Sequence, residues 1–378
     1  MKIGFDVRPL QTAHRGSGIG TYTFNLLKHL LALPGQDEWV CYTLRGSQQD
    51  VGIDLPGQFP VHRPANQAHI GLWEQLLLPI DILRGRVNLF HATGGLTQVW
   101  EICAPRIQPV RTVVTVQDLH PLILPHFKFI GSARSFKWQM EAIRKAARVI
   151  AVSENTKQDI VRFVQVPPEN IEVIHMAPGE HFQVLDASEV QACLEKYRIQ
   201  PPFVLYVGNY NIHKNFEAIM EAWRLIHPVV PLVVVGKRDS YPRNLLDRAA
   251  ELGRSDAVHM IGDLSYNSPD LVALYNAATV FVFPSLYEGF GLPVVEAMRC
   301  GCPVIASRRG SLPEVVGEGG RLVEPDDISG LAEEMQRIID DDQWRETMRA
   351  KGFENAGRFS WQQIAEKTLA LYHEVASP

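Results

Sequence analysis

The chain has 378 residues, a length that favours two domains at roughly 150 residues per domain. Apolar residues make up 46% of the sequence and charged residues 21%, as is usual for a protein with a buried core. The 37 basic and 42 acidic side chains give a formal charge of −5, which argues against a protein that coats nucleic acid, because that binding needs clustered cations.

The cysteines and the first residues indicate the compartment. Five cysteines are an odd number, spread along the chain, which predicts reduced thiols in the cytosol rather than a disulfide framework. Cys300 and Cys302 have no second pair beside them, so they give a zinc site little support. Asp6 and Arg8 stand where a signal peptide needs an unbroken apolar stretch, and no apolar run approaches the ~18 residues of a membrane span. We expect a soluble, cytoplasmic protein, with contact at the inner face of the membrane left open.

Short apolar, β-branched runs alternate along the chain with amphipathic stretches of helical length. Strands are predicted at 3–7, 40–44, 87–91, 112–116, 149–152, 203–207, 232–236, 258–261, 280–284 and 303–306. Helices are predicted at 22–33, 132–147, 216–226, 270–277, 331–339 and 361–375. Strands that are apolar throughout and separated by helices predict parallel sheets built from right-handed βαβ units.

The alternation weakens in the middle of the chain. Three dipeptides mark this stretch: Pro167-Pro168, Pro178-Gly179 and Pro201-Pro202. We place the domain boundary there, at about 185–200. The sequence thus predicts two α/β domains facing each other across a cleft. Ligands of open parallel sheets bind beyond the carboxyl ends of the strands, which directs attention to the loops after Val7, Val207 and Phe283.

Three glycines follow the first predicted strand. Gly16, Gly18 and Gly20 precede a helix that we expect to begin near Tyr22. Glycines allow a tight turn, and a helix N-terminus offers N–H groups and the positive end of a dipole, which suits a diphosphate. The spacing is not the GxGxxG of dinucleotide folds, and the strand at 40–44 ends without the acid that would bind an adenosine ribose. A surface loop without a ligand is the alternative.

A lysine follows the first strand of the second half. After the strand at 203–207 come Gly208 and a short turn, and Lys214 lies where the next helix is expected to begin. The positive end of the helix dipole disfavours a cation at that place. The position therefore suggests an anion that compensates the ammonium group, with a solvated lysine as the alternative.

Two glutamates bracket a glycine-containing loop after the strand at 280–284. Glu288 lies in the loop, and Glu296 lies about one turn into a helix whose first turn contains Pro293. Both carboxylates can therefore face the crevice at the strand ends. The backbone amides between them belong to Gly289, Phe290, Gly291 and Leu292. A nucleotide sugar needs this set, amide donors for its phosphates and carboxylates for the hydroxyls of ribose and hexose.

The stretch 281–298 resembles the E-x7-E motif of retaining glycosyltransferases of family 4, which have the GT-B fold. Further stretches resemble the same family: Gly16–Tyr22, Val152–Thr156, Tyr206–Asn215, Leu271–Tyr275, Gly301–Ser307 and Ser311–Val315. The resemblance implies two Rossmann-like parallel-sheet domains facing a cleft. Residues 1–185 would form the acceptor domain, completed by a returning C-terminal helix at 359–378, and residues 196–357 would form the nucleotide-sugar-binding domain.

The resemblance also implies roles for individual residues. Lys214 would neutralise the diphosphate, Glu296 would accept hydrogen bonds from the ribose, and Glu288 would hold the donor sugar. The backbone of Gly289, Phe290, Gly291 and Leu292 would contact the sugar and phosphates, and Gly208 would belong to the same donor site. Gly16, Gly18 and Gly20 would close over the phosphates from the first domain. The catalytic residues would be Glu288, Lys214 and Asp118.

Two positions depart from the family pattern. Asn209 stands where the family often has an arginine, so Lys214 either carries the charge alone or is helped by Lys237, Arg238 or Arg308. Gln117 precedes Asp118 where the family commonly has a histidine, and glutamine cannot take up a proton. His120 either substitutes for that histidine or has no role.

No cofactor and no metal are expected, because Lys214 and the helix N-termini can supply the positive charge that a departing diphosphate needs. The leaving phosphate itself can deprotonate the acceptor, so no protein base is named. Asp340-Asp341-Asp342 superficially offers an Asp-x-Asp metal site, but it lies between two predicted helices and is interpreted as helix capping.

The donor and acceptor are the least determined features. The resemblance of the Ser311–Val315 stretch to bacterial polysaccharide mannosyltransferases favours GDP-mannose, and the acceptor would be a hydroxyl of a saccharide or a lipid-linked saccharide. The oligomeric state is not predicted. The segment 68–84 is interpreted as a core helix, with contact to a bilayer surface as the alternative.

Other classes share parts of this pattern. They are a nucleotide-sugar epimerase or a phosphorylase with the same architecture, an NAD-dependent oxidoreductase, and a nucleotide-sugar-binding protein without transferase activity. The fold alone does not separate the first two from a transferase. The departure at Gln117 leaves open the alternative of a nucleotide-sugar-binding protein without transferase activity.

Overall fold

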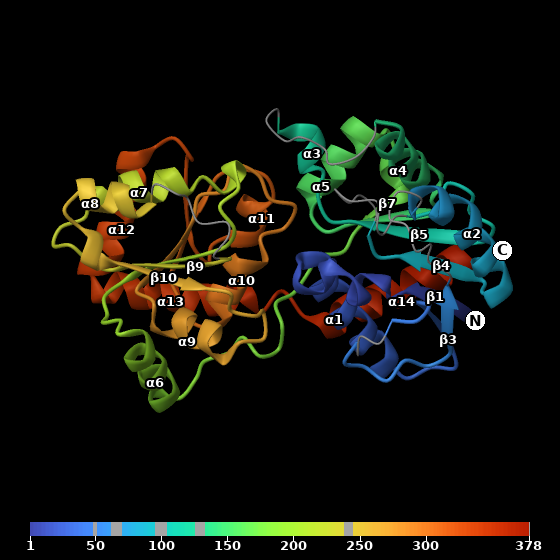
Figure 1. Ribbon diagram of the computed structural model, residues 1–378, viewed down its shortest axis with the longest axis horizontal. Helices are drawn as coiled ribbons and strands as arrows, with labels where there is room; N and C mark the ends of the chain where they lie inside the picture. The colour runs from blue at the N-terminus through green and yellow to red at the C-terminus, as the bar shows by residue number, and fades with distance from the viewer. Residues whose placement is uncertain (48–50, 62–69, 95–103, 125–132, 238–244, 378) are drawn as a thin grey trace. The chain divides into compact units, whose positions relative to one another are not determined.

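The computed structural model divides into two compact units, residues 1–176 with 360–378, and residues 177–359 (Figure 1). The structure describes residues 1–47, 51–61, 70–94, 104–124, 133–237 and 245–377. Among the described helices, none is long and apolar enough to cross a membrane. Each unit is described separately below.

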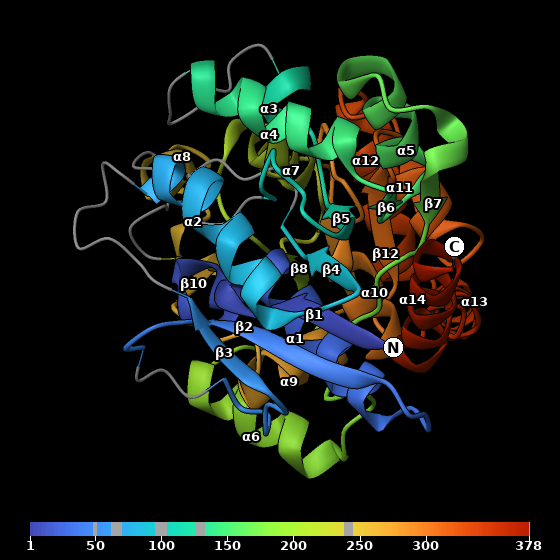
Figure 2. The ribbon, with the colours of Figure 1, turned by 90° about the vertical axis from the view of Figure 1, so that its right-hand side faces the viewer.

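The first unit contains a seven-stranded sheet in the order β3-β2-β1-β4-β5-β6-β7, and all its pairings are parallel. Figure 2 shows the strands in this order. Their bounds are β1 Lys2–Asp6, β2 Glu38–Leu44, β3 Gln58–Val61, β4 Leu89–Ala92, β5 Arg111–Val116, β6 Arg148–Ala151 and β7 Ile171–Val173. The helices are α1 Gly18–Ala32, α2 Ile70–Gly85, α3 His120–Ile123, α4 Ala133–Lys145, α5 Glu154–Asp159 and α14 Trp361–Ala376.

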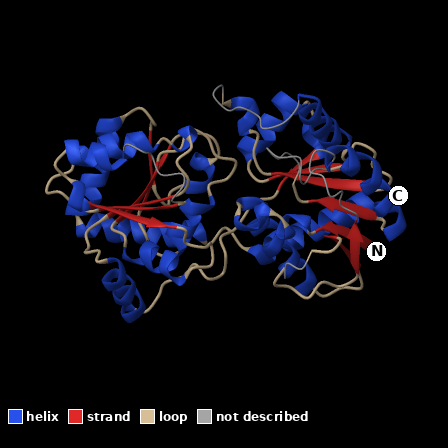
Figure 3. Cartoon of the chain, in the orientation of Figure 1, coloured by secondary structure: helices blue, strands red, loops and turns tan. Residues whose placement is uncertain are grey.

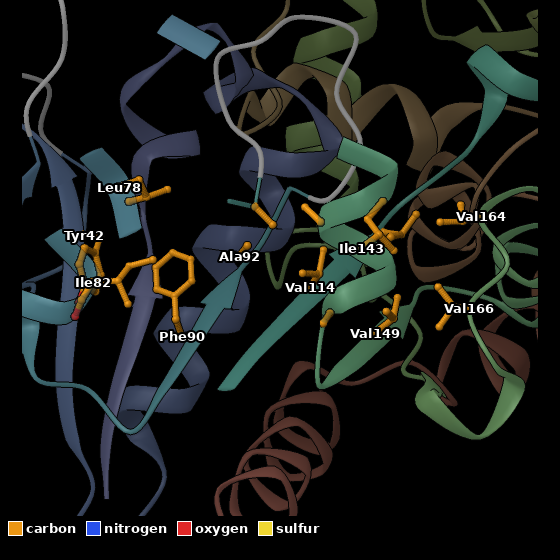
Figure 4. Close-up of a cluster of buried hydrophobic side chains, with 14 of the residues drawn as sticks. Tyr42, Leu78, Ile82, Phe90, Ala92, Val114, Ile143, Val149, Val164 and Val166 are labelled. Atoms are coloured by element: carbon orange, nitrogen blue, oxygen red, sulfur yellow. The ribbon is translucent and has the colours of Figure 1, made fainter. Parts of the chain in front are cut away.

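Helices lie on both faces of each sheet (Figure 3). In the first unit one face carries a buried apolar cluster that includes Tyr42 of β2 and Phe90 of β4 (Figure 4). Leu78 and Ile82 of α2 and Ile143 of α4 belong to the same cluster. Because successive side chains of a strand point to opposite faces, neighbouring residues of the same strands are available to the helices on the other side.

The other face binds α14 through a buried polar network. His91 of β4 lies 2.5 Å from the Tyr372 hydroxyl through Nδ1 and 2.8 Å from the Thr115 hydroxyl through Nε2. Tyr22 of α1 reaches the same Thr115 hydroxyl at 2.9 Å. Burial lowers the pKa of His91 to about 3, so its ring is neutral and serves as a structural hydrogen-bonding group. The predicted return of the C-terminal helix to the first domain is confirmed.

The second unit contains a six-stranded parallel sheet in the order β10-β9-β8-β11-β12-β13. Its strands are β8 Val204–Val207, β9 Leu232–Gly236, β10 Val258–Gly262, β11 Val280–Phe283, β12 Val304–Ser307 and β13 Arg321–Val323. Its helices are α6 Ala187–Tyr197, α7 Phe216–Arg224, α8 Leu245–Glu251, α9 Pro269–Ala277, α10 Leu292–Arg299, α11 Leu312–Val316, α12 Ile328–Asp340 and α13 Asp342–Ala356. The expected fold class, two Rossmann-like parallel-sheet domains, is confirmed.

The units divide at Met176 and Ala177, earlier than the boundary expected at 185–200. Residues just after this point already pack on the second unit, because the Gly179 N–H donates to the Tyr266 hydroxyl at 3.0 Å and the Phe182 ring lies 5.4 Å from the Tyr266 ring. Inside the expected linker lies α6, which Lys196 fixes to Asp270 of α9 at 2.6 Å. Pro178-Gly179 and Pro201-Pro202 are therefore part of the second unit, whereas Pro167-Pro168 belongs to the first.

All ten predicted strands are present within two residues of their predicted bounds. The three additional strands β3, β7 and β13 are edge strands of three or four residues. Their short length leaves too few residues for an apolar run, and β3 also contains Pro60, which is tolerated at a sheet edge.

Candidate active site

The loops after β8 and β11 meet at the carboxyl edge of the second sheet, because these two strands are neighbours. The Leu286 N–H donates to the His213 carbonyl at 2.6 Å. Lys214 follows His213, and its ammonium group lies 2.5 Å from Oε1 of Glu288. The two side chains are 14% and 13% exposed, and the Lys214 Nζ lies 5.1 Å above the Phe283 ring. Two predicted site residues that are far apart in sequence thus form one ion pair.

This ion pair changes the interpretation of the lysine. Its place before α7 led us to expect a compensating anion, and the structure supplies one in the Glu288 carboxylate. An external anion is therefore not needed to explain why Lys214 stands there. A partly buried pair of this kind costs desolvation energy that the attraction between the charges only partly offsets, so a strongly charged ligand can compete for either partner.

The Glu288 loop is supported by a turn that the sequence reasoning did not assign to the site. Ser311 donates from its hydroxyl to the carbonyls of Glu288 at 3.0 Å and of Phe290 at 2.8 Å, and its N–H reaches the Glu288 carbonyl at 3.2 Å. Gly310 has φ +57°, and a Cβ there would lie 2.9 Å from the backbone N and O of Glu288. A side chain at position 310 would collide with the backbone of Glu288, so the loop can take this path only with glycine there.

A helix begins directly behind this loop. Gly291 is the N-cap of α10 with φ +98°, Leu292 is the first helical residue, and no side chain caps the first turn. Gly289 and Phe290 are buried in front of it. A helix N-terminus without a side-chain cap leaves backbone N–H groups available to an anion. The four residues predicted to contact the sugar and phosphates therefore lie at a helix N-terminus, as expected from Pro293.

Glu296 lies inside α10 and is only 3% exposed. The Tyr275 hydroxyl donates to its Oε2 at 3.2 Å, and the Tyr266 hydroxyl forms a second hydrogen bond. Burial raises the pKa of this carboxyl from 4.5 to about 8, although the two tyrosine hydrogen bonds lower it. We expected a carboxylate that can face the crevice, and the structure adds hydrogen bonds to it from two tyrosines. Both tyrosines resembled ordinary core aromatics in the sequence, which is why they were missed.

Gly208 follows β8 directly. A Cβ at this position would lie 3.0 Å from the Tyr206 hydroxyl, which itself donates to the Asn209 carbonyl at 2.5 Å. The turn after the strand is thus packed closely against Tyr206. Asn209, which replaces the arginine of the family pattern, is exposed.

The glycines of the first unit have different surroundings from those expected. A short 3₁₀ helix covers Ala13–Gly16 and α1 begins at Gly18, four residues before the predicted start near Tyr22. A Cβ at Gly20 would lie 2.4 Å from the His14 carbonyl oxygen, so this glycine is required for packing inside the first turn of α1. A Cβ on Gly16 would enter open space. The N-terminus of α1 has no side-chain cap, which leaves N–H groups for an anion there too.

Gln117 lies beside this helix N-terminus, because its Oε1 is 3.5 Å from the position of a Cβ on Gly18. Its Nε2 is buried and has no hydrogen-bond partner among the described residues. Next to it, the Asp118 carboxylate and the His120 ring are hydrogen-bonded to each other. The structure thus brings Gly18 and Gln117 together and couples His120 to Asp118.

The remaining candidate residues lie in several places. Lys237 is exposed after β9, Arg308 pairs with Glu324 at 3.5 Å, and Arg238 lies outside the described residues. Asp341 caps α13 by accepting from the Trp344 N–H at 2.8 Å, which confirms the capping interpretation for that residue. The described cysteines are buried free thiols, and Cys103 lies outside the described part of the chain.

Comparison with known proteins agrees with this geometry. The family model for glycosyl transferases group 1 matches residues 194–355, and the model for glycosyltransferase family 4 matches residues 16–177. The O-antigen chain mannosyltransferase B of Escherichia coli is 31% identical over 269 residues, which cover 69% of this chain and 70% of that protein. The MMP alpha-(1->4)-mannosyltransferase of Mycolicibacterium hassiacum is 46% identical over 129 residues, which cover 33% of this chain and 31% of that protein.

A solved structure shows the same architecture over the whole chain. Anabaena Alr3699/HepE in complex with UDP and glucose has a TM-score of 0.78 and 19% identity, over 99% of this chain and 100% of that one. At this identity the likeness concerns the fold, while the family follows from the two family models and the Escherichia coli relative. The chain therefore belongs to glycosyltransferase family 4 and has the GT-B fold.

Proposed function

We propose that this protein is a retaining hexosyltransferase that moves mannose from GDP-mannose to a hydroxyl of a saccharide or a lipid-linked saccharide. The observation that carries the proposal is the Lys214–Glu288 ion pair, which lies next to the uncapped N-terminus of α10 at the carboxyl edge of a parallel sheet. The names of two relatives, both mannosyltransferases, support mannose as the sugar.

The ion pair suggests how the donor would bind. The diphosphate carries more negative charge than Glu288, so it would compete for the Lys214 ammonium group, which lies 2.5 Å from the Glu288 carboxylate. Once released, the Glu288 carboxylate can accept hydrogen bonds from the hydroxyls of the sugar. Donor binding would therefore replace one internal ion pair by two contacts with the ligand.

The same groups would act during the reaction. Retaining transfer passes through a state in which the sugar becomes oxocarbenium-like while negative charge grows on the departing diphosphate. Lys214 and the backbone N–H groups at the start of α10 would stabilise that charge without rearrangement, which is the largest help a site can give. This mechanism needs no metal ion, and the leaving phosphate would take the proton of the acceptor hydroxyl.

The proposal also assigns roles to the residue that would bind the donor ribose and to residues of the first unit. Glu296 would accept hydrogen bonds from the ribose by exchanging one of its tyrosine partners, Tyr266 or Tyr275. In the first unit the Gln117 Nε2, which has no hydrogen-bond partner in the described part of the chain, and the N-terminus of α1 would provide donors for an anion. Asp118 would act from the same unit, with its carboxylate positioned by His120.

The donor is tested by incubation with GDP-mannose, UDP-glucose and UDP-GlcNAc in separate reactions, with free nucleoside diphosphate as the readout. We expect slow release from GDP-mannose only, and NMR of a transferred product should show the α configuration of the donor. A thermal-shift series with GDP, UDP and ADP should give the largest rise in Tm with GDP, because a ligand that binds only the folded state stabilises it. Release from a UDP sugar alone would overturn the choice of donor.

A matched pair of variants separates catalysis from binding. Glu288→Gln should abolish release, whereas Glu318→Gln, which changes an exposed glutamate of the same unit, should leave it unchanged. Tight binding of GDP-mannose without release, under every acceptor tried, would instead favour the alternative of a nucleotide-sugar-binding protein.

A further inference from the structure

Helix α2 of the first unit turns apolar side chains outward. Leu76, Leu77, Ile80 and Leu83 are 53%, 40%, 43% and 56% exposed. Their spacing places them on one continuous face of the helix. No other described helix carries more than one exposed large apolar side chain, and single ones are normal for a protein surface. A face of four large apolar residues on one helix is instead typical of an interaction surface.

The inward side of the same helix carries two buried polar residues beside its apolar ones. Gln75 and Asp81 are 6% and 3% exposed. The Gln75 Oε1 accepts from the Arg106 N–H at 2.8 Å, and Asp81 lies 3.6 Å from Arg84. The usual arrangement of a surface helix, with polar residues toward water, is therefore reversed for these residues.

The orientation of the helix is fixed by close packing. Leu78 and Ile82 enter the apolar cluster beneath it (Figure 4). At its C-terminal end a Cβ on Gly85 would lie only 2.1 Å from the Tyr42 hydroxyl, which donates to the Ile82 carbonyl at 3.2 Å. A rotation that buried the exposed leucines would break these contacts. The apolar face is thus a stable feature of the folded unit.

The charges around this face identify what it binds. Arg84 is 65% exposed at the end of the helix, and Arg86 is exposed just after it. Among the described side chains from 75 to 88 the only acid is the buried Asp81, although the whole chain has a formal charge of −5. A second copy of the chain would bring the same two arginines and no described acid on this face to pair with them.

We propose that the outward face of α2 docks on an anionic lipid surface. Leucines in the interfacial region with arginines at the phosphate level form the usual combination of a helix that lies in the plane of a membrane. With 16 residues the helix is about 24 Å long at ~1.5 Å per residue, shorter than the ~30 Å hydrocarbon core. The helix therefore lies on the membrane and does not span it. The proposal does not depend on the transferase reaction.

Vesicle flotation of the full-length protein tests this proposal. Wild type should bind vesicles of equal parts phosphatidylcholine and phosphatidylglycerol, and bind pure phosphatidylcholine vesicles weakly. Leu76→Gln/Leu83→Gln should reduce partitioning about tenfold or more, because two apolar side chains no longer enter the interface. The matched control Leu225→Gln/Leu246→Gln changes two exposed leucines of the second unit and should bind as wild type does.

A second variant isolates the charges. Arg84→Gln/Arg86→Gln should lose the preference for phosphatidylglycerol while keeping the weak affinity for phosphatidylcholine. The leucine variants should keep the wild-type Tm, and the arginine variant should have a slightly lower Tm because Asp81 loses its contact with Arg84. Nucleoside diphosphate release without lipid should be unchanged in all of them, so a failure of the proposed transfer reaction is seen separately. Two results would overturn the proposal: no binding of wild type to either vesicle, or equal binding of wild type and the leucine variant. Dissociation of a wild-type dimer by the leucine substitutions, without vesicle binding, would identify a second copy as the occupant.

Discussion

Lys214 and Glu288 hold each other in a partly buried pair, so removing one of them differs from removing both. A single substitution leaves the remaining charge mostly buried and without its partner. A double substitution to neutral side chains leaves no unpaired charge. The structure therefore separates the contribution of the pair to folding from its proposed contribution to catalysis.

We predict that Lys214→Met lowers the free energy of unfolding by about 1–3 kcal/mol, less than a fully buried pair would lose, because the charges retain some contact with water. Lys214→Met/Glu288→Gln should recover most of that loss while remaining inactive. Urea unfolding of wild type, both single variants and the double variant forms a double-mutant cycle. Additive losses in this cycle would show that the two charges do not interact.

Glu296 gives a second prediction, because burial raises its pKa from 4.5 to about 8. Between these values the folded carboxyl holds a proton that the unfolded one has lost. The free energy of unfolding should therefore fall as pH rises through this window, by at most about 1.4 kcal/mol per pH unit, and level off above it. Glu296→Gln, which is always neutral, should remove this fall.

Urea unfolding at a series of pH values across that window measures the difference between wild type and Glu296→Gln. The difference should be smallest at the acid end and should grow in favour of the variant toward alkaline pH. Parallel curves would mean that the carboxyl is ionised throughout, and the two tyrosines would then be donors to a carboxylate.

At the scale of elements, the loop between β11 and α10 owes its shape to the turn before α11. Ser311 is fully buried and donates to two carbonyls of that loop. The position of Glu288 thus depends on a residue that has no charge and need not touch a ligand.

We predict that Ser311→Ala costs about 1–3 kcal/mol of stability, because the Phe290 carbonyl loses the hydroxyl donor and the Glu288 carbonyl keeps only the N–H of residue 311. It should also reduce turnover more than it weakens nucleotide binding. Steady-state kinetics and GDP titration measure the two effects. Ser329→Ala is the control, since that hydroxyl is bonded to Asp327 at an exposed helix start. Wild-type turnover in Ser311→Ala would show that the loop keeps its shape without these bonds.

The sequence was most informative about the interiors of the sheets. Strands such as β9 and β11 are apolar throughout because both faces are covered, and such runs are visible in a sequence. The edge strands β7 and β13 were missed because they contain three residues each. The rule that ligands bind beyond strand ends directed attention to the loops of Lys214 and Glu288, and the family resemblance implied one donor site for both. Their direct pairing was not predicted, because no local pattern encodes a contact between distant residues.

The glycines show another limit of a sequence pattern. Gly16, Gly18 and Gly20 are evenly spaced, yet Gly20 is fixed by packing against His14 and Gly16 has open space. The residue type alone does not distinguish a close approach of the backbone from freedom to turn. The same holds for Tyr266 and Tyr275, whose contact with Glu296 depends on helix packing.

At the scale of the whole molecule, the second unit is continuous in sequence and has its own buried core. We predict that residues 177–359 fold when produced alone and unfold cooperatively on heating. If the nucleotide binds mainly to this unit, GDP should raise its Tm as it does for the full chain. Calorimetry of the fragment measures both. A fragment that folds but does not respond to GDP would assign nucleotide affinity to residues of the first unit.

The first unit is discontinuous, and α14 contributes Tyr372 to its buried network. During synthesis on the ribosome, the strands of this unit are made before residues 177–359, and α14 is made after them. The strands are therefore without α14 until residues 177–359 have been made. The face that α14 covers, with His91 and Thr115, is open to water for that whole interval. A nascent chain of this protein is therefore exposed to capture by chaperones on this face of its first unit, until α14, translated after residues 177–359, covers it.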